Sequence, residues 1–243
     1  MVVMKALLTA LFFFLPFHAW AQCRHALILA LDVSASVTWK EYRMQQAGLA
    51  AALRDPEVVE LILSDNEAPI AITVFEWGGD RDQEMSVPWT LLDSLASIDQ
   101  VAEQIQAHSS QRDTIRTAIG QALEFSKQQF EIGPDCLRRT IDVSTDGKNN
   151  VDPDPSVVYA SGDFAEIIVN TLSIGESTDI ANALEKNEAL FVYHQTYINH
   201  GFGAFTIAAE GFEDYQAAMK RKLIRELSPL AVGWRKMRDY ALR

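Results

Sequence analysis

The fold of this chain is decided by the stretch Asp32-Val33-Ser34-Ala35-Ser36, which stands between an apolar run and a helix start. The run before it, residues 26–31, reads Ala-Leu-Ile-Leu-Ala-Leu, and a short apolar run ahead of a polar turn is typical of a buried strand. Thr38 and Glu41 have the spacing of a capping box, which predicts a helix from residue 38. The polar side chains therefore lie on a tight loop at the carboxyl end of a strand, where open α/β sheets bind ligands.

The alternate positions of Asp32, Ser34 and Ser36 can aim one carboxylate and two hydroxyl groups at a single point. Hard oxygen donors of this kind suit Mg²⁺ or Mn²⁺ better than zinc. Aspartate and serine also favour turns and helix caps, so this stretch alone leaves an ordinary polar loop as the alternative.

Apolar runs alternate with helical patterns along the rest of the chain. We expect strands over residues 24–31, 68–77, 138–144, 167–174 and 205–208, and a proline-containing edge strand over residues 84–89. We expect helices over residues 38–54, 94–107, 117–130, 185–198 and 212–227. Strands that alternate with helices predict one domain with a mostly parallel sheet, covered by helices on both faces.

Residues 1–21 are predicted to be a signal peptide rather than part of the fold. Lys5 supplies a positive start, residues 6–17 form an apolar core, and Ala19-Trp20-Ala21 is a cleavage sequence. We therefore expect an exported protein, periplasmic or secreted, whose mature chain begins at Gln22. No other stretch is long and apolar enough to predict a transmembrane segment in that mature chain.

The charge of the chain restricts its partners. The formal net charge is -12, and removal of residues 1–21 takes away only the positive charge of Lys5, leaving -13. Such an acidic chain is a poor ligand for nucleic acid or for an anionic membrane. Residues 229–243 are locally basic, with Trp234 and Tyr240 among residues of net charge +3. This tail either folds back onto the acidic body or frays.

Two cysteines remain after the signal peptide, Cys23 and Cys136, each just before a predicted strand. An even number of cysteines in an oxidising compartment predicts a disulfide, with two free thiols as the alternative. If the two strands are parallel neighbours, both cysteines lie at the same edge of the sheet. The bond would then close a loop of about 110 residues and stabilise the fold by about 4–5 kcal/mol.

Two further stretches have the features of the first. Residues 141–147 end a strand at Asp146, and Gly147 allows a sharp turn there. Thr117 stands at the predicted start of the helix over residues 117–130. If these loops lie beside the first one, Asp146 and Thr117 complete a set of five oxygen-bearing residues.

Together these stretches resemble the metal-ion-dependent adhesion site of the von Willebrand factor type A domain. They are Asp32-x-Ser34-x-Ser36, Thr117-x-Ile119-x-x-Ala122-Leu123 and Thr145-Asp146-Gly147. The resemblance covers roughly residues 24–227. It implies a domain over residues 22–228 with a three-layer α/β/α, Rossmann-like fold, whose mostly parallel central sheet has one antiparallel edge strand. On residues 142–150 and 201–227, the chain is similar to a group of exported bacterial proteins of this fold whose function is unassigned.

The resemblance implies a binding function and no enzymatic activity. It assigns an Mg²⁺ or Mn²⁺ ion to Asp32, Ser34, Ser36, Thr117 and Asp146, with one position left for an acidic side chain of a partner protein. Many members of the family carry Gly-Gly where this chain has Ile115-Arg116, so Thr114 is the alternative to Thr117.

Neighbouring residues leave further alternatives. Lys148, Asn149 and Asn150 either contact a ligand or are ordinary turn residues. Asp142 is unusual inside a strand, and we expect it to pair with a basic residue or to brace the Asp146 loop.

A structural or assembly subunit with a non-essential metal site is an alternative function. A metal-dependent hydrolase would need a general base near the ion, and the motifs contain no histidine or glutamate.

Overall fold

A six-stranded sheet in the order β3-β2-β1-β4-β5-β6 forms the centre of the computed structural model. The structure describes residues 23–65, 67–79, 82–110, 116–176 and 180–228. The expected signal peptide of residues 1–21, the tail of residues 229–243 and Thr114 therefore lie outside the described residues. The parallel strands are β1 (His25–Asp32), β2 (Ile70–Trp77), β4 (Arg139–Thr145), β5 (Ile167–Ile174) and β6 (Thr206–Ala209). The edge strand β3 (Glu84–Leu92) pairs antiparallel with β2, which confirms the predicted sheet.

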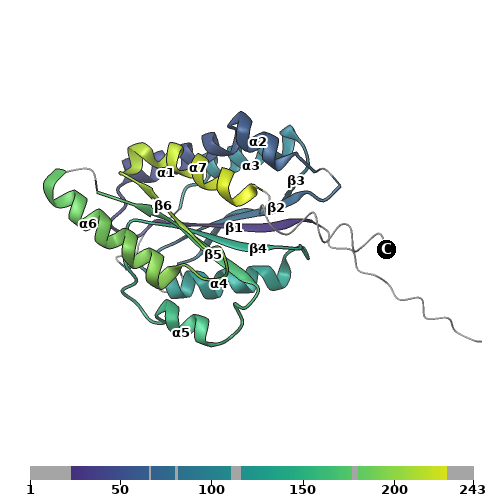
Figure 1. The fold of residues 1–243 in the computed structure, drawn as a ribbon. Coiled ribbons are helices and arrows are strands. Elements are labelled where there is room, and N and C mark those ends of the chain that lie inside the picture. The colour runs from purple at the N-terminus through teal and green to yellow at the C-terminus, as the bar shows by residue number, and fades with distance from the viewer. Residues whose placement is uncertain (1–22, 66, 80–81, 111–115, 177–179, 229–243) are drawn as a thin grey trace, which may run out of the picture.

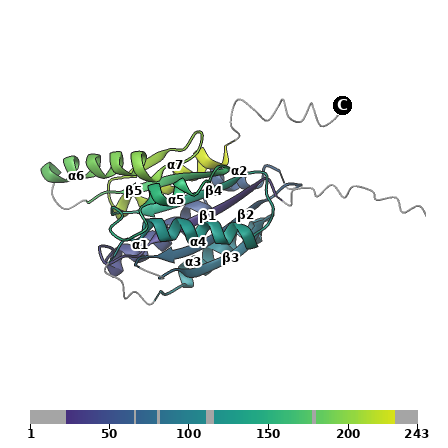
Figure 2. The ribbon, with the colours of Figure 1, turned by 90° about the horizontal axis from the view of Figure 1, so that it is seen from below.

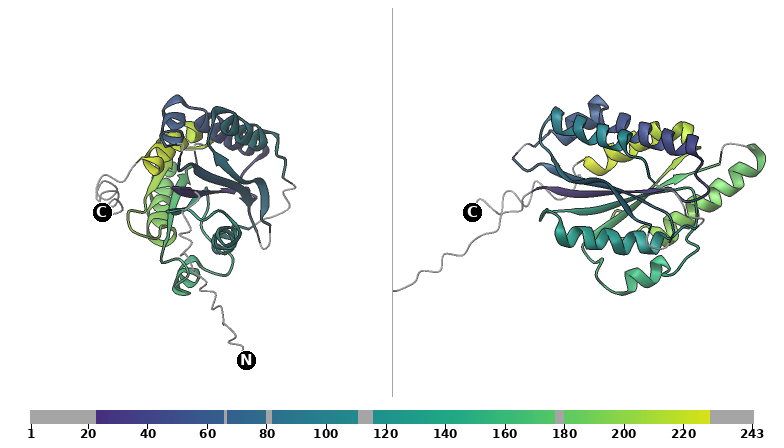
Figure 3. Two further views of the ribbon diagram at one scale, coloured as in Figure 1. Left: turned by 90° about the vertical axis from the view of Figure 1, so that its right-hand side faces the viewer. Right: turned by 180° about the vertical axis from the view of Figure 1, so that it is seen from behind.

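Helices cover both faces of this sheet and make the three expected layers (Figure 1). One face carries α1 (Trp39–Leu53), α2 (Pro56–Ile62), α3 (Leu95–Ala107) and α7 (Tyr215–Leu227). The other carries α4 (Ile119–Ile132), α5 (Pro155–Ala160) and α6 (Ile180–Tyr193), as Figure 2 shows from below. α6 continues into the π-helical turn η1 (His194–Ile198) and extends beyond the carboxyl ends of the strands (Figure 3). A 3₁₀ turn, η2 (Phe212–Asp214), precedes α7. Within the described residues, none of the helices combines the length and apolarity that a membrane span requires.

The central strand β1 separates two hydrophobic cores. Side chains alternate between the two faces of a strand, so Leu27, Leu29 and Leu31 pack under α1 and α7, whereas Ile28 packs toward α4. All eight residues of β1 are buried. This burial on both faces explains why the strand is a continuous apolar run rather than an alternating one.

The capping box predicted at the start of the first helix is confirmed. The backbone N–H of Glu41 donates to Thr38 Oγ1 at 3.3 Å, and the Glu41 carboxylate accepts from the Thr38 N–H at 2.8 Å. α1 consequently begins at Trp39, and the cap holds the end of the loop that contains Ser36.

Several expected boundaries were wrong. Two short helices, α2 and α5, were not predicted; each begins at an Asp-Pro pair, at Asp55 or Asp154, because aspartate caps the first turn and proline suits the first helical position. α4 begins at Ile119 rather than residue 117, and α6 at Ile180 rather than residue 185. β3 continues to Leu92, past its proline, which an edge strand tolerates because one side of it needs no ladder partner.

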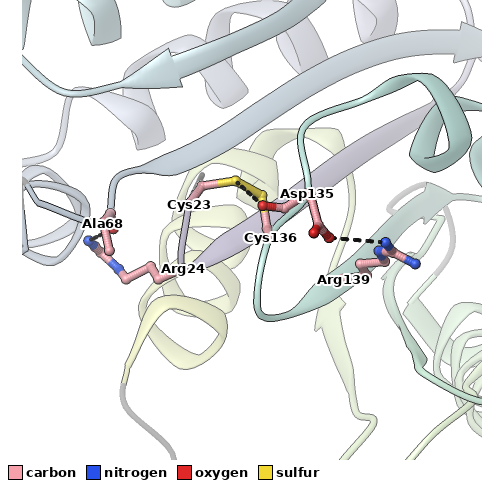
Figure 4. The surroundings of a disulfide bond; sticks show 6 residues. All are labelled: Cys23, Arg24, Ala68, Asp135, Cys136 and Arg139. Atoms are coloured by element: carbon pink, nitrogen blue, oxygen red, sulfur yellow. Dashed lines mark hydrogen bonds and ion pairs between the residues drawn. A yellow bond between two sulfur atoms is a disulfide. The ribbon is translucent and has the colours of Figure 1, made fainter. Parts of the chain in front are cut away.

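The predicted disulfide between Cys23 and Cys136 is present, and no free cysteine remains in the described chain. Figure 4 shows it beside the start of β1, with Cα atoms 4.6 Å apart. Because β1 and β4 are parallel neighbours, the two cysteines meet at the amino edge of the sheet. The end of α7 reaches the same edge, where the Arg138 guanidinium donates to the Glu226 carbonyl. The first and last described residues, Cys23 and Ser228, therefore share this edge.

A buried charged cluster of Asp142, Lys222 and Glu226 joins β4 to α7. The side chains of Asp142 and Lys222 are fully buried, and Lys222 Nζ lies 2.7 Å from Asp142 Oδ1 and 2.8 Å from Glu226 Oε1. Asn170 on β5 donates to the same Glu226 oxygen at 2.9 Å. Burial, and then the charge of Glu226, raise the pKa of Asp142 to about 8. Asp142 therefore pairs with a basic residue, which was the first of the two expectations for it.

Candidate metal centre

Three loops meet at the carboxyl edge of the sheet, opposite the disulfide. The loops after β1 and β4 are adjacent because these strands pair in parallel, with Leu31 beside Ser144. The loop before α4 joins them through Asn150, whose side-chain oxygen accepts from the Thr117 N–H at 2.9 Å. The Asn150 N–H donates in return to the Thr117 carbonyl at 3.0 Å. All three predicted motifs are therefore brought together.

The hydroxyl groups of these loops form one continuous chain of contacts. Thr117 Oγ1 donates to Ser34 Oγ at 3.4 Å, and Ser34 Oγ lies 3.2 Å from Ser36 Oγ. Ser36 Oγ donates to Asp146 Oδ1 at 2.8 Å. Four of the five predicted residues thus contact one another through their oxygen atoms, although they come from three separate parts of the sequence.

The fifth residue, Asp32, lies beneath this chain and is fully buried. Its Oδ1 accepts from the Ser34 N–H at 2.8 Å, and its Oδ2 accepts from the Thr145 hydroxyl at 2.5 Å. Gln45 on α1 donates to the Asp32 carbonyl at 3.1 Å. Burial, and then the charge of Asp146, raise the pKa of Asp32 to about 7.

The donor set fits a hard divalent cation. Burial raises the pKa of Asp146 as well, and the charge of Asp146 raises the pKa of Asp32, so two carboxyl groups whose ionisation is disfavoured stand beside three hydroxyl groups. A cation between them would relieve that repulsion, and hydroxyl and carboxylate oxygens are ligands that Mg²⁺ and Mn²⁺ accept. Ser36 is exposed and Asp146 is half-buried, so the site is open to solvent on one side. Within the described residues, no group of three His, Cys, Asp or Glu side chains could hold a metal, so this site depends on its hydroxyl groups.

The sequence predicted that Thr117 begins a helix, and this was wrong. Thr117 lies two residues before α4, whose N-cap position is Ala118 and has no side-chain cap. The hydroxyl of Thr117 is directed at Ser34 instead. A Cβ atom on Gly147 would lie 3.2 Å from Thr117 Oγ1, so the glycine allows the two loops to approach. The close approach explains why a glycine follows Asp146.

Two contributors to the site were missed from the sequence. Thr145 stood in a quoted motif without a role, yet its hydroxyl orients Asp32. His194, from η1, contacts the Gly147 carbonyl through Nε2 at 2.8 Å. Burial lowers the pKa of His194 to about 4, so a neutral imidazole donates this bond at pH 7. No local pattern marks a histidine that lies 47 positions away from its partner.

The side chains of Lys148, Asn149 and Asn150 differ in their surroundings. Asn149 accepts from the Gly120 N–H at 3.3 Å and donates to the Val151 carbonyl at 2.7 Å, so it holds loops together as Asn150 does. Lys148 is exposed, and its Nζ lies 5.3 Å from the centre of the Tyr193 ring. Lys148 and Asn150 are both exposed, but the Asn150 side chain is bonded to the Thr117 N–H, which leaves Lys148 as the candidate ligand contact of the three.

Comparison with protein families adds an assignment. The family described as "Protein of unknown function (DUF1194)" matches residues 22–231. The chain belongs to this family. No curated protein matches it.

Solved structures share the fold of this DUF1194 chain. Proximal thread matrix protein 1 from the mussel byssus aligns with a TM-score of 0.57 and 16% identity over 85% of this chain and 48% of its own. A von Willebrand factor type A protein from Catenulispora acidiphila aligns with a TM-score of 0.55 and 15% identity, over 84% of this chain and 43% of its own. The pilus adhesin SpaC from Lactobacillus rhamnosus GG aligns with a TM-score of 0.56 and 10% identity, over 84% of this chain and 30% of its own. The chain spans about half the length of the mussel protein. These similarities confirm the von Willebrand factor type A fold.

Proposed function

We propose that this protein is an exported binding module that uses Mg²⁺ or Mn²⁺ to capture an acidic side chain of a partner protein. The contact chain from Thr117 through Ser34 and Ser36 to Asp146, directly above buried Asp32, is the observation that carries the proposal. The bound ion would supply the positive charge that attracts an external carboxylate.

The residues divide this task between them. Ser34, Ser36 and Thr117 would offer hydroxyl oxygens to the ion. Both oxygens of Asp32 already accept hydrogen bonds from the protein, so Asp32 would contribute mainly its negative charge or act through water. Few direct carboxylate ligands leave a cation with more charge to attract an external anion. The exposed side of the site, at Ser36 and Asp146, is where a partner would approach.

Two of the similar proteins support this proposal by their names. One structure of the mussel protein has a "zinc occupied MIDAS motif", and SpaC is a pilus adhesin. The disulfide supports export, because such bonds persist in oxidising compartments. The expected cleavage near Ala21 remains part of the proposal.

A metal-dependent hydrolase is less well supported by the geometry. It would need a general base that can reach a water molecule held by the ion. The imidazole of His194, which contacts the Gly147 carbonyl beside the site, is buried. The arrangement therefore favours binding over hydrolysis.

Calorimetric titration of residues 22–243 with Mn²⁺ and Mg²⁺ tests the proposal. Saturable binding to the wild type that is lost in Asp146→Ala is the expected result. The matched control is Asp163→Ala, which removes an exposed aspartate that pairs with Lys127 elsewhere on the surface. Equal affinity in Asp146→Ala would contradict the site, and a wild type without metal binding would favour the structural or assembly subunit.

A further inference from the structure

A π-helical turn lies beside the candidate metal centre. Such turns are rare and often occur at functional sites. In η1, buried His194 contacts the Gly147 carbonyl, and the Tyr159 hydroxyl donates to the Ile198 carbonyl. The first contact fixes the turn relative to the loop that carries Asp146, and the second fixes it relative to α5.

An aromatic rim, formed by Lys148, Tyr193 and Tyr197, connects the turn to that loop. The Asn149 N–H donates to the Tyr193 hydroxyl at 3.2 Å, and Lys148 Nζ lies 5.3 Å from the Tyr193 ring centre. The Tyr197 ring stands 5.1 Å from that of Tyr193, tilted by 36°. The rim thus begins two residues after Asp146 and continues along η1.

The rim is accessible and differs in charge from the rest of the chain. Tyr197 is 53% exposed, and Lys148 is exposed as well. The formal net charge of the whole chain is -12. An acidic segment that approaches the metal centre from this side would meet the Lys148 ammonium group and two tyrosine rings. Tyrosine is enriched where protein interfaces have their strongest contacts.

We propose that the aromatic rim is a second contact surface for the partner, and that the partner segment carries an aromatic side chain next to the carboxylate bound at the metal centre. The partner's aromatic ring would pack on Tyr197 and Tyr193, because offset or edge-to-face ring pairs are favourable. Lys148 would face the partner's negative charge. This inference rests on the proposed function, since the metal centre must hold the carboxylate first.

Two capped peptides, acetyl-Gly-Asp-Trp-Gly-amide and acetyl-Gly-Asp-Gly-Gly-amide, test the inference with residues 22–243. Each has one carboxylate, and they differ only in the residue that follows it. Affinities are measured by NMR titration with saturating Mg²⁺, which does not broaden signals as Mn²⁺ does. We expect the wild type to prefer the tryptophan peptide by about fivefold or more, the scale of an aromatic pair.

Variants identify the side chain responsible. Tyr197→Ala should remove the preference and Tyr197→Phe should keep it. The matched control is Phe202→Ala, because Phe202 is an aromatic residue that is 94% exposed in the loop before β6. Mg²⁺ affinity is measured for each variant alongside the peptides.

Each contrary outcome has a distinct meaning. A preference that persists in Tyr197→Ala overturns the inference and leaves the proposed function standing. Trp39 is another exposed aromatic residue, 56% exposed at the start of α1. If the preference disappears only in Trp39→Ala, the partner's ring binds there and not on the rim, so the inference is again overturned while the proposed function stands. Weaker Mg²⁺ binding in Tyr197→Ala would also overturn it, by showing that the rim supports the metal centre instead. If neither peptide binds the Mg²⁺-loaded wild type, the proposed function fails and the inference fails with it.

Discussion

At the scale of single residues, Asp32 combines two roles that conflict when no cation is present. Its carboxylate is fully buried and shares the site with Asp146, which raises its pKa to about 7. Its oxygens are nevertheless held in place by the Ser34 N–H and the Thr145 hydroxyl. A buried charge without a counter-ion is costly, so a residue built for cation binding weakens the cation-free fold.

We therefore predict opposite effects of Asp32→Asn on metal affinity and on stability. The amide keeps the shape and both hydrogen-bond partners, because Thr145 can accept where it now donates. Mn²⁺ affinity should fall by about 10- to 100-fold, as for groups that act on a metal from just outside its ligands. The melting temperature in a chelator at neutral pH should stay equal or rise. Calorimetry and thermal unfolding measure the two effects, and unchanged Mn²⁺ affinity would contradict the assigned role.

At the scale of elements, α7 is held against β4 by polar contacts in the interior. Tyr215 and Ser144 hydroxyl oxygens lie 3.3 Å apart, and the buried charged cluster lies further along the same helix. Lys222 is the one cation in this cluster, between the carboxylates of Asp142 and Glu226. Removing one partner of a buried ion pair is far more costly than removing an exposed pair.

Lys222→Met should therefore lower the free energy of unfolding by about 3–5 kcal/mol, because the buried acidic side chains of Asp142 and Glu226 lose their ammonium partner. Arg221→Met, at the adjacent exposed position that pairs with Asp214, is the matched control and should change stability by less than about 1 kcal/mol. Urea denaturation of both variants measures the difference. Equal stability of the two variants would show that the cluster does not secure α7.

The pH dependence of stability should depend on the same cluster. The pKa of Asp142 is raised to about 8 in the fold from an unfolded value of 3.8. The unfolded chain thus releases this proton first, and the stability due to protonated Asp142 is present below pH 3.8 and is lost as the pH rises through about 8. Asp142→Asn keeps the group neutral, so its melting temperature should fall less than that of the wild type between about pH 5 and about pH 8.5. Parallel curves for the two proteins would contradict this account.

At the scale of the whole molecule, the disulfide closes a loop between residues 113 positions apart. The bond joins the amino ends of the adjacent strands β1 and β4, so the closed loop contains most of the first half of the fold. By the chain-entropy relation, the Cys23→Ser and Cys136→Ser double variant should lose about 4–5 kcal/mol. The free energy of unfolding of this variant, compared with that of the oxidised wild type, checks the value. The reduced wild type is the control and should match the variant, because both lack the same bond.

The order of layers was predictable from the sequence, and the reason is physical. Buried parallel strands require continuous apolar runs, and polar turns with capping residues mark where each run ends, as at Asp32 and Thr38. Because parallel strands align their carboxyl ends, the meeting of Ser36 and Asp146 could also be predicted. These features depend on local patterns, which a single sequence displays.

Other features could not be predicted, since they arise from contacts between distant segments. The residues around Lys222 do not predict its partner Asp142, 80 positions earlier, and the residues around His194 do not predict its contact with Gly147. Asp55-Pro56 is equally compatible with the end of one helix and the start of the next, and the fold uses it for both. The role of the Thr117 hydroxyl depends on where α4 begins, which shifts by a residue or two with packing.

Cys23 and Ser228 share the amino edge of the sheet, whereas the candidate metal centre occupies the opposite edge. A tether attached beyond either of these residues would hold the molecule upright on a support, with Ser36, Asp146 and the aromatic rim directed outward. Immobilisation through the carboxyl terminus is therefore the orientation of choice for partner capture from solution. Coupling through surface amines, which include that of Lys148, would instead risk blocking the face that is to be tested.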